Sequence, residues 1–500
     1  MANLFKQSRK KSASSSSVKK GANANAQVAG LRFAKKSSIA TKRTDIVDKK
    51  GQQSKTSENI VSISIDTLDW MGQGVSRGNP TYFVQGALPK EQCDVEILSV
   101  KKTVAQATTV NVVAPSEHRV EPFCPVFEQC GGCQLQHIEP QAALLQRDTA
   151  LREMMERQLS MSASAWQKPL SGERPQYRRK ARLAIDARNV DNVKLGFREA
   201  GSNKVVNVNT CPILTPTLTT LPGLLQNCIS GFDSAKYIGH ISLMETDSNE
   251  NTNTAWVTIK HTKPLEPLLL DTLIALAKEQ CFTLSLENKR GAIRSLYDAT
   301  QSESLRDTAS SAKIYTVDGF WLSPSANDFV QVNKAVNEQM IHQALSWLDV
   351  GSDERVADWF CGLGNFTLPL AKTGAHVQAV EGVAEMVQRA KVNASAQGIE
   401  NVEWLHLDLA DETNVEQSLS QGFDKVLLDP SRDGALTVCH ALVKAMPKAI
   451  VYVSCNPSTF ARDAKVLLEG GFTIEKAGAV EMFPFTHHME MMALFTAVSR

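Results

Sequence analysis

The run DWFCGLGNFTLPLA (residues 358–371) decides the fold of the C-terminal part of this chain. A strand pattern leads into it, a G-x-G turn follows at Gly362 and Gly364, and a helical pattern begins after the turn. Open α/β sheets bind ligands at such a turn, at the carboxyl end of the strand. A dinucleotide fingerprint has a third glycine, but position 367 is threonine. The run predicts a ligand site on a Rossmann-like sheet and weakens the case for a nicotinamide cofactor.

Outward from this turn, strand and helix patterns alternate from about residue 335 to the end of the chain. Alternation of this kind is typical of a doubly wound parallel sheet. We therefore expect residues 326–500 to form one α/β domain.

Two further acidic residues follow the next strand patterns. Glu381 ends the second strand, where a carboxylate can bind ribose hydroxyls. Asp408 ends the third strand, where it can meet an adenine edge. These acids and a two-glycine turn favour S-adenosylmethionine over NAD. An ordinary strand–helix turn is the alternative.

The fourth and fifth strand patterns end in residues with chemical potential. Pro430 stops the fourth strand and holds Asp429 at the edge of the sheet. Cys455 ends the fifth strand, just before a helix N-terminus that would favour its thiolate. A buried inert thiol is the commoner fate of a lone cysteine. Because Cys455 is expected at the same edge as the cofactor turn, we interpret it as a nucleophile.

Glu490 lies just before the last strand pattern, after two adjacent histidines. Neighbouring histidines point apart, so a general base is a better interpretation of Glu490 than a metal ligand. Methylation of uracil at C5 needs these groups: a thiolate that adds to C6, a sulfonium methyl donor, a base for the C5 proton and a partner for the uracil edge. Cys455, the 358–408 site, Glu490 and Asp429 match those needs.

A second feature is a group of four cysteines. Cys124, Cys130 and Cys133 are spaced C-x5-C-x2-C, and Cys211 follows in a Cys-Pro pair. Four such thiols fit an iron–sulfur cluster or a structural zinc, and the spacing leaves both open. Two disulfides are disfavoured because no secretory signal is recognised.

The segments before the C-terminal domain differ in composition. Residues 1–57 form a basic tail that we expect to be disordered. Short strand patterns in 58–122 predict a five-stranded barrel of the OB kind. Residues 123–325 form a mixed central domain, with a helix at 141–157 and a surface insertion at 300–313. Within it, alternation places Arg178, Lys180 and Arg182 on one strand face, as a candidate ridge for phosphates.

Charge is distributed unevenly along the chain. Residues 1–50 contain 13 Lys and Arg and two acids, a net of +11; because the chain carries +1, the rest carries about −10. This asymmetry suggests an RNA partner, although a solvated tail without a partner is the alternative. No run of apolar residues predicts a membrane span. We expect a cytoplasmic monomer that binds neither DNA nor membranes.

Several motifs together resemble one family, the RNA uracil-C5 methyltransferases, in the branch that modifies 23S ribosomal RNA and carries an iron–sulfur cluster. The resemblance covers about residues 58–499. It rests on the motifs GQGV (72–75), FVQGALP (83–89), CPVFEQCGGCQLQH (124–137), NTCPIL (209–214), FVQVN (329–333), DWFCGLGNFTLPLA (358–371), LLDPSRDGA (427–435), YVSCNPSTFARD (452–463) and FPFTHHME (483–490).

The resemblance implies a TRAM barrel, a cluster-bearing central domain and a Rossmann-like methyltransferase domain that acts on 23S ribosomal RNA. It implies Cys455 as nucleophile and Glu490 as base. The implied ligands of a 4Fe–4S cluster are Cys124, Cys130, Cys133 and Cys211. The implied contacts to S-adenosylmethionine are Gln331, Phe360, Gly362, Gly364, Asn365, Glu381, Asp408 and Asp429.

Two other functions remain open. Transfer RNA is the alternative substrate, although relatives that act on it usually lack the barrel and the cysteines. A non-catalytic RNA-binding or assembly protein is the second alternative. The presence of both Cys455 and Glu490 argues against it.

Overall fold

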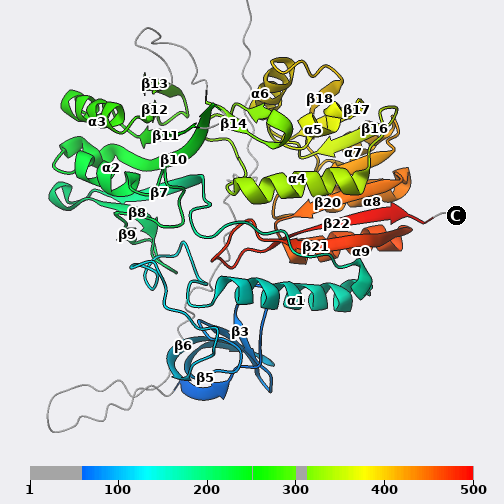
Figure 1. Cartoon of the computed structure of the whole chain (residues 1–500), viewed down its shortest axis with the longest axis horizontal. Helices are drawn as coiled ribbons and strands as arrows, with labels where there is room; N and C mark the ends of the chain where they lie inside the picture. The colour runs from blue at the N-terminus through cyan, green and yellow to red at the C-terminus, as the bar shows by residue number, and fades with distance from the viewer. Residues whose placement is uncertain (1–58, 250–251, 300–311, 499–500) are drawn as a thin grey trace, which may run out of the picture. The chain divides into compact units, whose positions relative to one another are not determined.

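The computed structural model describes residues 59–249, 252–299 and 312–498. The expected tail at 1–57 and most of the insertion at 300–313 fall outside these ranges. The described residues lie in the compact unit Thr56–Arg500 and include three large β-sheets (Figure 1). None of the helices in the described ranges has the length and hydrophobicity needed to cross a membrane.

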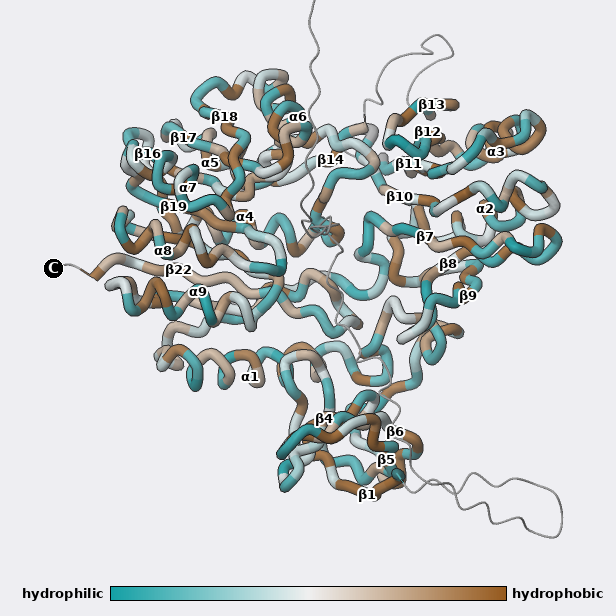
Figure 2. Tube along the Cα trace, turned by 180° about the vertical axis from the view of Figure 1, so that it is seen from behind, coloured by the Kyte–Doolittle hydropathy of each residue, from teal (hydrophilic) through white to brown (hydrophobic). Residues whose placement is uncertain are grey.

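The N-terminal sheet has six strands in the order β1-β5-β6-β4-β3-β2, where we expected five. The first predicted strand run is divided because the chain changes partner: β1 pairs with β5, whereas β2 pairs with β3. Leu98 and Val100 of β5 and Val110 of β6 are exposed hydrophobic residues. Figure 2 colours the residues of these strands by hydropathy. The strands are β1 (Ile60–Ser64), β2 (Thr67–Leu68), β3 (Gly74–Ser76), β4 (Thr81–Gln85), β5 (Gln92–Lys101) and β6 (Val104–Ala114).

The central sheet has the order β13-β12-β11-β10-β7-β8-β9. Helices α2 and α3 contact each other and cover one face, where Leu225 and Leu269 pack with strand residues such as Ile241. The elements are β7 (Lys180–Asp186), β8 (Lys194–Arg198), β9 (Val205–Asn207), α2 (Leu221–Ile229), β10 (Ile238–Asn249), β11 (Thr252–His261), α3 (Pro267–Glu279), β12 (Thr283–Glu287) and β13 (Ile293–Tyr297). A hairpin of β14 (Ile314–Tyr315) and β15 (Trp321–Leu322) follows.

The C-terminal sheet has the order β18-β17-β16-β19-β20-β22-β21. We expected a parallel sheet, and this prediction is wrong for the last described strand. β22 is antiparallel to both of its neighbours. The chain turns back after β21 and inserts its last strand between β21 and β20. The strands are β16 (Arg355–Trp359), β17 (His376–Glu381), β18 (Val402–His406), β19 (Lys425–Leu428), β20 (Ala449–Ser454), β21 (Phe472–Val480) and β22 (Glu490–Ala497).

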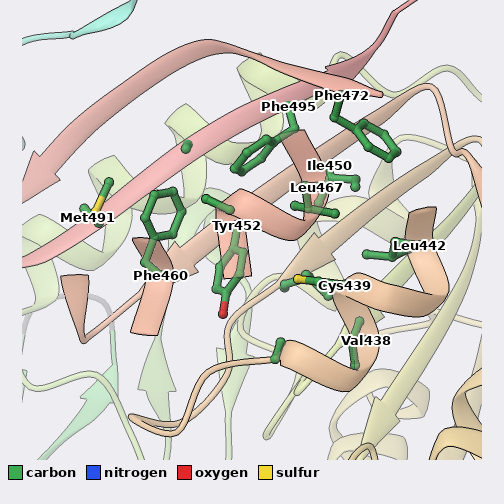
Figure 3. Close-up of a cluster of buried hydrophobic side chains, with 14 of the residues drawn as sticks. Val438, Cys439, Leu442, Ile450, Tyr452, Phe460, Leu467, Phe472, Met491 and Phe495 are labelled. Atoms are coloured by element: carbon green, nitrogen blue, oxygen red, sulfur yellow. The ribbon is translucent and has the colours of Figure 1, made fainter. Parts of the chain in front are cut away.

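Helices cover both faces of this sheet, since successive strand residues point to opposite sides. Val356 belongs to the core with α4 and α5, and its neighbour Ala357 to the core with α7, α8 and α9. Figure 3 shows part of the second core, around Tyr452 and Phe460. The helices are α4 (Lys334–Leu348), α5 (Thr367–Lys372), α6 (Ala384–Ser395), α7 (Glu412–Leu419), α8 (Leu436–Ala445) and α9 (Pro457–Glu469).

The long helix α1 (Pro140–Leu159) confirms the predicted helix at 141–157. It contacts α9 and β21, and its buried Leu151 and Met155 join the core of the C-terminal sheet. Helix α1 therefore contributes to the core of the C-terminal sheet, although it lies far outside the domain expected at residues 326–500.

Candidate active site

The turn after β16 has an unusual backbone. Phe360, Gly362 and Gly364 all have positive φ, at 66°, 58° and 95°. Two of the three are glycines, which adopt this conformation without a steric penalty. A Cβ atom on Gly364 would lie 3.3 Å from the Trp404 ring. Small residues therefore keep this turn open at the carboxyl edge of the sheet.

Glu381 at the end of β17 holds the turn from the neighbouring strand. Its Oε2 accepts a hydrogen bond from the Gly362 N–H at 3.1 Å, and its Oε1 accepts one from the Val383 N–H at 3.0 Å. The carboxylate is thus fixed beside the G-x-G turn, as the sequence predicted, with lone pairs left for a ligand.

Asp358 is a buried acidic residue beside the glycine turn that the sequence did not single out. It is fully buried in β16, and its Oδ2 accepts a hydrogen bond from the Thr367 hydroxyl, while its Oδ1 has no partner. Burial raises the pKa of Asp358 to about 7. Thr367, which stands where a dinucleotide fingerprint has its third glycine, therefore has a structural role, because its hydroxyl donates a hydrogen bond to the Asp358 carboxyl group. The sequence signal that could have indicated it is an acidic residue within an otherwise apolar strand, just before the glycine turn.

The other predicted cofactor residues are placed differently. Asn365 exchanges two side-chain hydrogen bonds with Asn337 of α4, at 2.9 and 3.0 Å, a partner that the sequence did not suggest. Asp408 is exposed, two residues beyond the end of β18, and accepts a hydrogen bond from the Ala410 N–H. Gln331 is half-buried just before α4. The structure thus places Asn365 and Glu381 in or against the turn.

Cys455, Glu490 and Asp429 lie at the same edge. Cys455 directly follows β20, and Glu490 begins the antiparallel β22, so the end of one strand is next to the start of the other. Asp429 follows β19, and its N–H donates to the Trp359 carbonyl at 3.3 Å. The charges of Glu490 and Asp429 both act on the Cys455 thiol. The three predicted catalytic residues are therefore brought together.

The expected thiolate character of Cys455 is wrong for the free protein. Burial, together with the charges of Glu490 and Asp429, raises the pKa of Cys455 to about 12, although Arg432 opposes the shift. Burial also raises the pKa of Glu490 to about 8, and that of Asp429 to about 7. The helix dipole is outweighed because a thiolate beside two carboxyl groups in a desolvated site is unfavourable.

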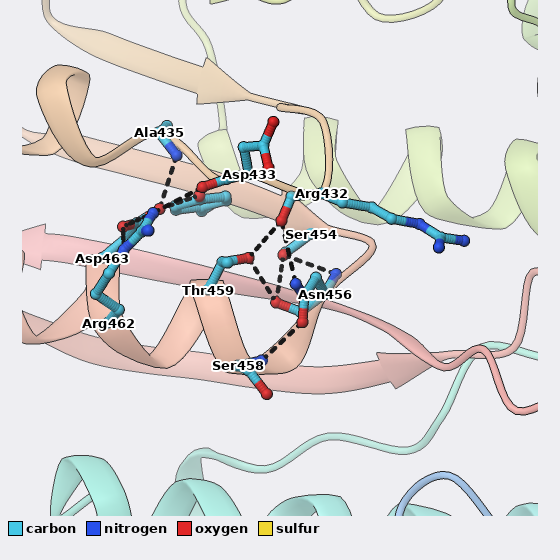
Figure 4. Close-up of polar contacts among 10 residues, drawn as sticks. Arg432, Asp433, Ala435, Ser454, Asn456, Ser458, Thr459, Arg462 and Asp463 are labelled. Carbon is cyan, nitrogen blue, oxygen red and sulfur yellow. Dashed lines mark hydrogen bonds and ion pairs between the residues drawn. The ribbon is translucent and has the colours of Figure 1, made fainter. Parts of the chain in front are cut away.

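A buried carboxylate fixes the loop that carries Asp429. Asp463 of α9 accepts hydrogen bonds from the Tyr452 hydroxyl and the Ala435 N–H, both at 2.7 Å. On the same loop, the Arg432 carbonyl accepts from the side chains of Asn456 and Thr459 (Figure 4). These hydrogen bonds hold the loop after β19 against the loop after β20 and the start of α9.

The four cysteines line one cavity of about 310 Å³. Their thiols are close enough to act on one another electrostatically, and all ten cysteines of the chain are free, so the disulfide alternative is not formed. Within the described ranges, no three His, Cys, Asp or Glu side chains are grouped as a metal-ion site. Four thiols that line one cavity are a donor set of the kind that binds an iron–sulfur cluster or zinc. Phe483, Thr486, His488 and Arg432 line the same cavity.

The predicted ridge of basic residues is not continuous. The Lys180 ammonium donates one hydrogen bond to the Asp328 carbonyl at 2.5 Å, and burial lowers the pKa of Lys180 to about 8. Arg178 lines the cysteine cavity and lies 5.9 Å from the centre of the Phe483 ring. Arg182 alone among the three is exposed. The prediction of a continuous ridge is wrong for two reasons. β7 begins only at Lys180, so Arg178 lies outside the strand. The side chains of Lys180 and Arg178 also contact other parts of the protein.

A Rossmann-like sheet with an open glycine turn, and with a cysteine and acids at its carboxyl edge, defines a methyltransferase fold. Residues 318–498 match the family described as tRNA (Uracil-5-)-methyltransferase. A crystal structure of Pyrococcus abyssi tRNA (uracil-54, C5)-methyltransferase with S-adenosyl-L-homocysteine is similar to this chain, with a TM-score of 0.64 and 22% identity over 87% of this chain and 100% of that one.

Curated relatives are closer in sequence. The 23S rRNA (uracil(1939)-C(5))-methyltransferase RlmD of Alteromonas mediterranea is 62% identical over 505 residues, 99% of each protein. The RlmD proteins of Alteromonas naphthalenivorans and Pectobacterium atrosepticum are 55% and 39% identical, over 87% of this chain and 89% and 93% of theirs. This chain belongs to the RlmD family of RNA uracil-C5 methyltransferases. The family predicted from the motifs is confirmed.

Proposed function

We propose that this protein transfers a methyl group from S-adenosylmethionine to C5 of a uridine in 23S ribosomal RNA, the reaction named for its RlmD relatives at uridine 1939. The observation that carries the proposal is the placement of Cys455 and Glu490 at one edge of the sheet, beside the turn that Glu381 holds. A uridine that reached this edge would meet a nucleophile, a base and a cofactor turn together.

The reaction begins with the Cys455 sulfur, which bonds to C6 of the uracil. Because the pKa of the thiol is about 12, it must lose its proton as the bond forms, and we assign Asp429 as the acceptor that passes this proton to solvent. The C5–C6 electron pair becomes an enolate centred on C5. S-adenosylmethionine would supply an electrophilic methyl group on a sulfonium. C5 takes that methyl group as the S–CH3 bond breaks, and S-adenosylhomocysteine is the leaving group.

Glu490 completes the cycle as the general base. Its carboxylate takes the C5 proton, and the electron pair of that bond restores the C5–C6 double bond. The Cys455 sulfur leaves as a thiolate, which takes a proton back from solvent. A pKa of about 8 suits this role, since the group can accept a proton and release it near neutral pH. Asp429, with a pKa of about 7, can present either an O–H donor or a carboxylate acceptor to the uracil edge.

The cofactor contacts follow the motifs of the family. We propose that the turn and Glu381 hold S-adenosylmethionine, with the ribose at Glu381 and the adenine near Asp408. The proposed set is Gln331, Phe360, Gly362, Gly364, Asn365, Glu381, Asp408 and Asp429.

We further propose that Cys124, Cys130, Cys133 and Cys211 hold a 4Fe–4S cluster. Support comes from the cavity that all four thiols line and from the Cys-Pro at its distant ligand. The role proposed for the cluster is structural, because no step of the methyl-transfer scheme is an oxidation or a reduction.

The N-terminal sheet at 58–122 is proposed as a TRAM barrel that binds RNA, followed by a central domain at 123–325 and the methyltransferase domain at 326–500. The target base must leave its stack to reach Cys455, as for other enzymes that modify bases. Single-stranded loops allow this at the lowest cost in stacking energy.

The test is mass-spectrometric mapping of methyl groups on unmodified 23S ribosomal RNA after incubation with the protein and S-adenosylmethionine. One 5-methyluridine with the native protein, and none with Cys455→Ala, supports the proposal. Cys281→Ala, at an exposed cysteine of the central domain, is the matched control that should methylate normally. Methylation of transfer RNA alone would favour the other substrate. Unchanged RNA with native binding would favour an assembly protein.

A further inference from the structure

Arg147 is a fully buried arginine in the middle of helix α1, and the catalytic scheme does not use it. Its Nε–H donates to the Trp70 carbonyl at 3.0 Å, and its Nη2 donates to the His488 carbonyl at 2.9 Å. Trp70 lies in the loop between β2 and β3 of the N-terminal sheet, and His488 lies two residues before Glu490. One guanidinium therefore joins the N-terminal sheet to the loop that carries the proposed base.

A guanidinium is an expensive group to bury. Removing it from water is unfavourable unless its donors are bonded, and a hydrophobic residue of similar volume would pack a helix face at lower cost. Burial lowers the pKa of Arg147 to about 10, against the opposing charges of Glu481 and Asp69. The side chain thus stays charged at neutral pH, and its directed hydrogen bonds are what an apolar side chain could not supply.

Neighbouring contacts bind the same two loops. The His487 ring nitrogen Nδ1 lies 2.7 Å from the Met71 carbonyl, next in sequence to the carbonyl that Arg147 binds. From the cysteine segment, the N–H groups of Gln134 and Leu135 both donate to the Phe485 carbonyl, at 2.8 and 3.0 Å. Phe485 has a positive φ of 65°, a conformation that a phenylalanine rarely adopts. The loop at 482–489 is thus held in one shape from outside its own sheet.

These contacts act mainly on one side of the catalytic pair. A link to the other side is the His488 ring, whose Nε2 lies 3.2 Å from Nη2 of Arg432. Glu490 follows the held loop without interruption and pairs with Val480 in the antiparallel sheet. Cys455 is positioned separately, by β20 and by the hydrogen bonds of Asp463 and Asn456 (Figure 4). A change at Arg147 should therefore move Glu490 more than Cys455.

We propose that Arg147 is a positioning residue for Glu490, and that it couples the placement of the N-terminal sheet to removal of the C5 proton. This inference rests on the proposed function. Its consequence is that the two halves of the reaction separate: attack by Cys455 and methyl transfer depend little on Arg147, whereas release of the product depends on it strongly.

The experiment compares two RNA substrates in the full-length protein. A 23S ribosomal RNA fragment transcribed with 5-fluorouridine stops after methyl transfer, because the base cannot remove fluorine from C5, and leaves a covalent protein–RNA adduct. The same fragment with uridine reports complete turnover. The variants are Arg147→Met, Arg147→Lys and the matched control Arg152→Met, which changes a half-exposed arginine of the same helix.

For Arg147→Met we expect adduct formation with the fluorinated RNA within about twofold of the native rate. Turnover on uridine RNA should fall about tenfold to a hundredfold, since a shift of about 1 Å at a catalytic group has such an effect. A covalent intermediate should then accumulate on the natural substrate. Arg147→Lys, which keeps the charge and can reach one carbonyl, should be intermediate, and Arg152→Met should match the native protein.

An equal loss of both reactions, or no loss of either, would overturn the inference. If Arg147→Met does not fold, His487→Ala, which removes the parallel contact to the Met71 carbonyl, should show the same separation in a smaller degree. The proposed function has its own readout: if the native protein forms no adduct with the fluorinated RNA, the chemistry itself is wrong, whatever the variants do.

Discussion

Ser454, the last residue of β20, lies opposite Met491, the second residue of β22. The two strands run in opposite directions, so the residue that follows β20 and the first residue of β22 meet at the same edge. These residues are Cys455 and Glu490. A parallel last strand would begin at the far edge of the sheet, and its first residue would lie a strand's length away from the cysteine.

Glu490→Gln should separate bond formation from release. The amide cannot accept the C5 proton, so turnover should fall by about 10²- to 10⁴-fold, while a covalent adduct between Cys455 and methylated RNA accumulates. Denaturing electrophoresis of the protein with labelled RNA measures this adduct. Glu475→Gln, an exposed change in the neighbouring β21, is the control and should leave turnover intact. Loss of turnover without any adduct would assign Glu490 to an earlier step.

Activity should rise with pH through about 8. The pKa of Glu490 is raised to about 8, so below that pH the base is mostly protonated and inactive. The pKa of Cys455, raised to about 12, acts in the same direction. We expect kcat/KM to increase by up to about tenfold per pH unit below the inflection. A pH profile from 6 to 9 with S-adenosylmethionine in excess measures it, and a plateau from pH 6 upward would contradict the assignment.

Asp358 should make the folded state less stable at higher pH. Its pKa is raised to about 7, so its contribution is complete below the ordinary pKa of an unfolded aspartate, about 3.9, and is lost as the pH rises through about 7. Asp358→Asn should therefore gain stability relative to the native protein between pH 5 and pH 8. Thermal unfolding of the cofactor-free protein at these pH values tests this.

Asp424 is the control for this prediction, because the pKa of its carboxyl group is lowered and not raised. The Lys448 side chain and the Arg355 N–H hold its pKa below the ordinary value, so its contribution is present at neutral pH and is lost as the pH falls through its folded pKa. Asp424→Asn should thus lose stability at neutral pH and lose less in acid. Identical pH profiles for the two variants would show that Asp358 is not desolvated as described.

Cys211→Ser should prevent assembly of the proposed cluster. Protein prepared without air should contain about four iron atoms and four sulfide ions per chain, and this variant should contain neither in full. Binding of S-adenosyl-L-homocysteine, measured by calorimetry, should change little, because the glycine turn lies in another sheet. Cys228→Ser, at a half-buried cysteine of the same domain outside the cavity, is the control. One zinc ion per chain without sulfide would replace the cluster by a structural zinc.

Local patterns predicted much of the fold. The G-x-G turn and the strand ends at Glu381, Asp429 and Cys455 were predictable because they depend on residues adjacent in sequence. Helix α7 and the division of the first N-terminal strand run were missed, since a short helix and a change of partner leave weak local signals. The pKa of Cys455 was predicted in the wrong direction, because its shift comes first from burial and then from the Glu490 and Asp429 carboxyl groups, all of which depend on segments distant along the chain.

The sequence by itself determined the family and the α/β class of the C-terminal domain, and it predicted the reactive residues, because motifs and periodicity are local properties of the chain. Only the tertiary structure decided the direction of the last strand and the convergence of four cysteines on one cavity. It also placed Arg147 between Trp70 and His488, which are separated from it by 77 and 341 residues. These relationships arise from packing between segments distant in sequence, and no local pattern encodes them.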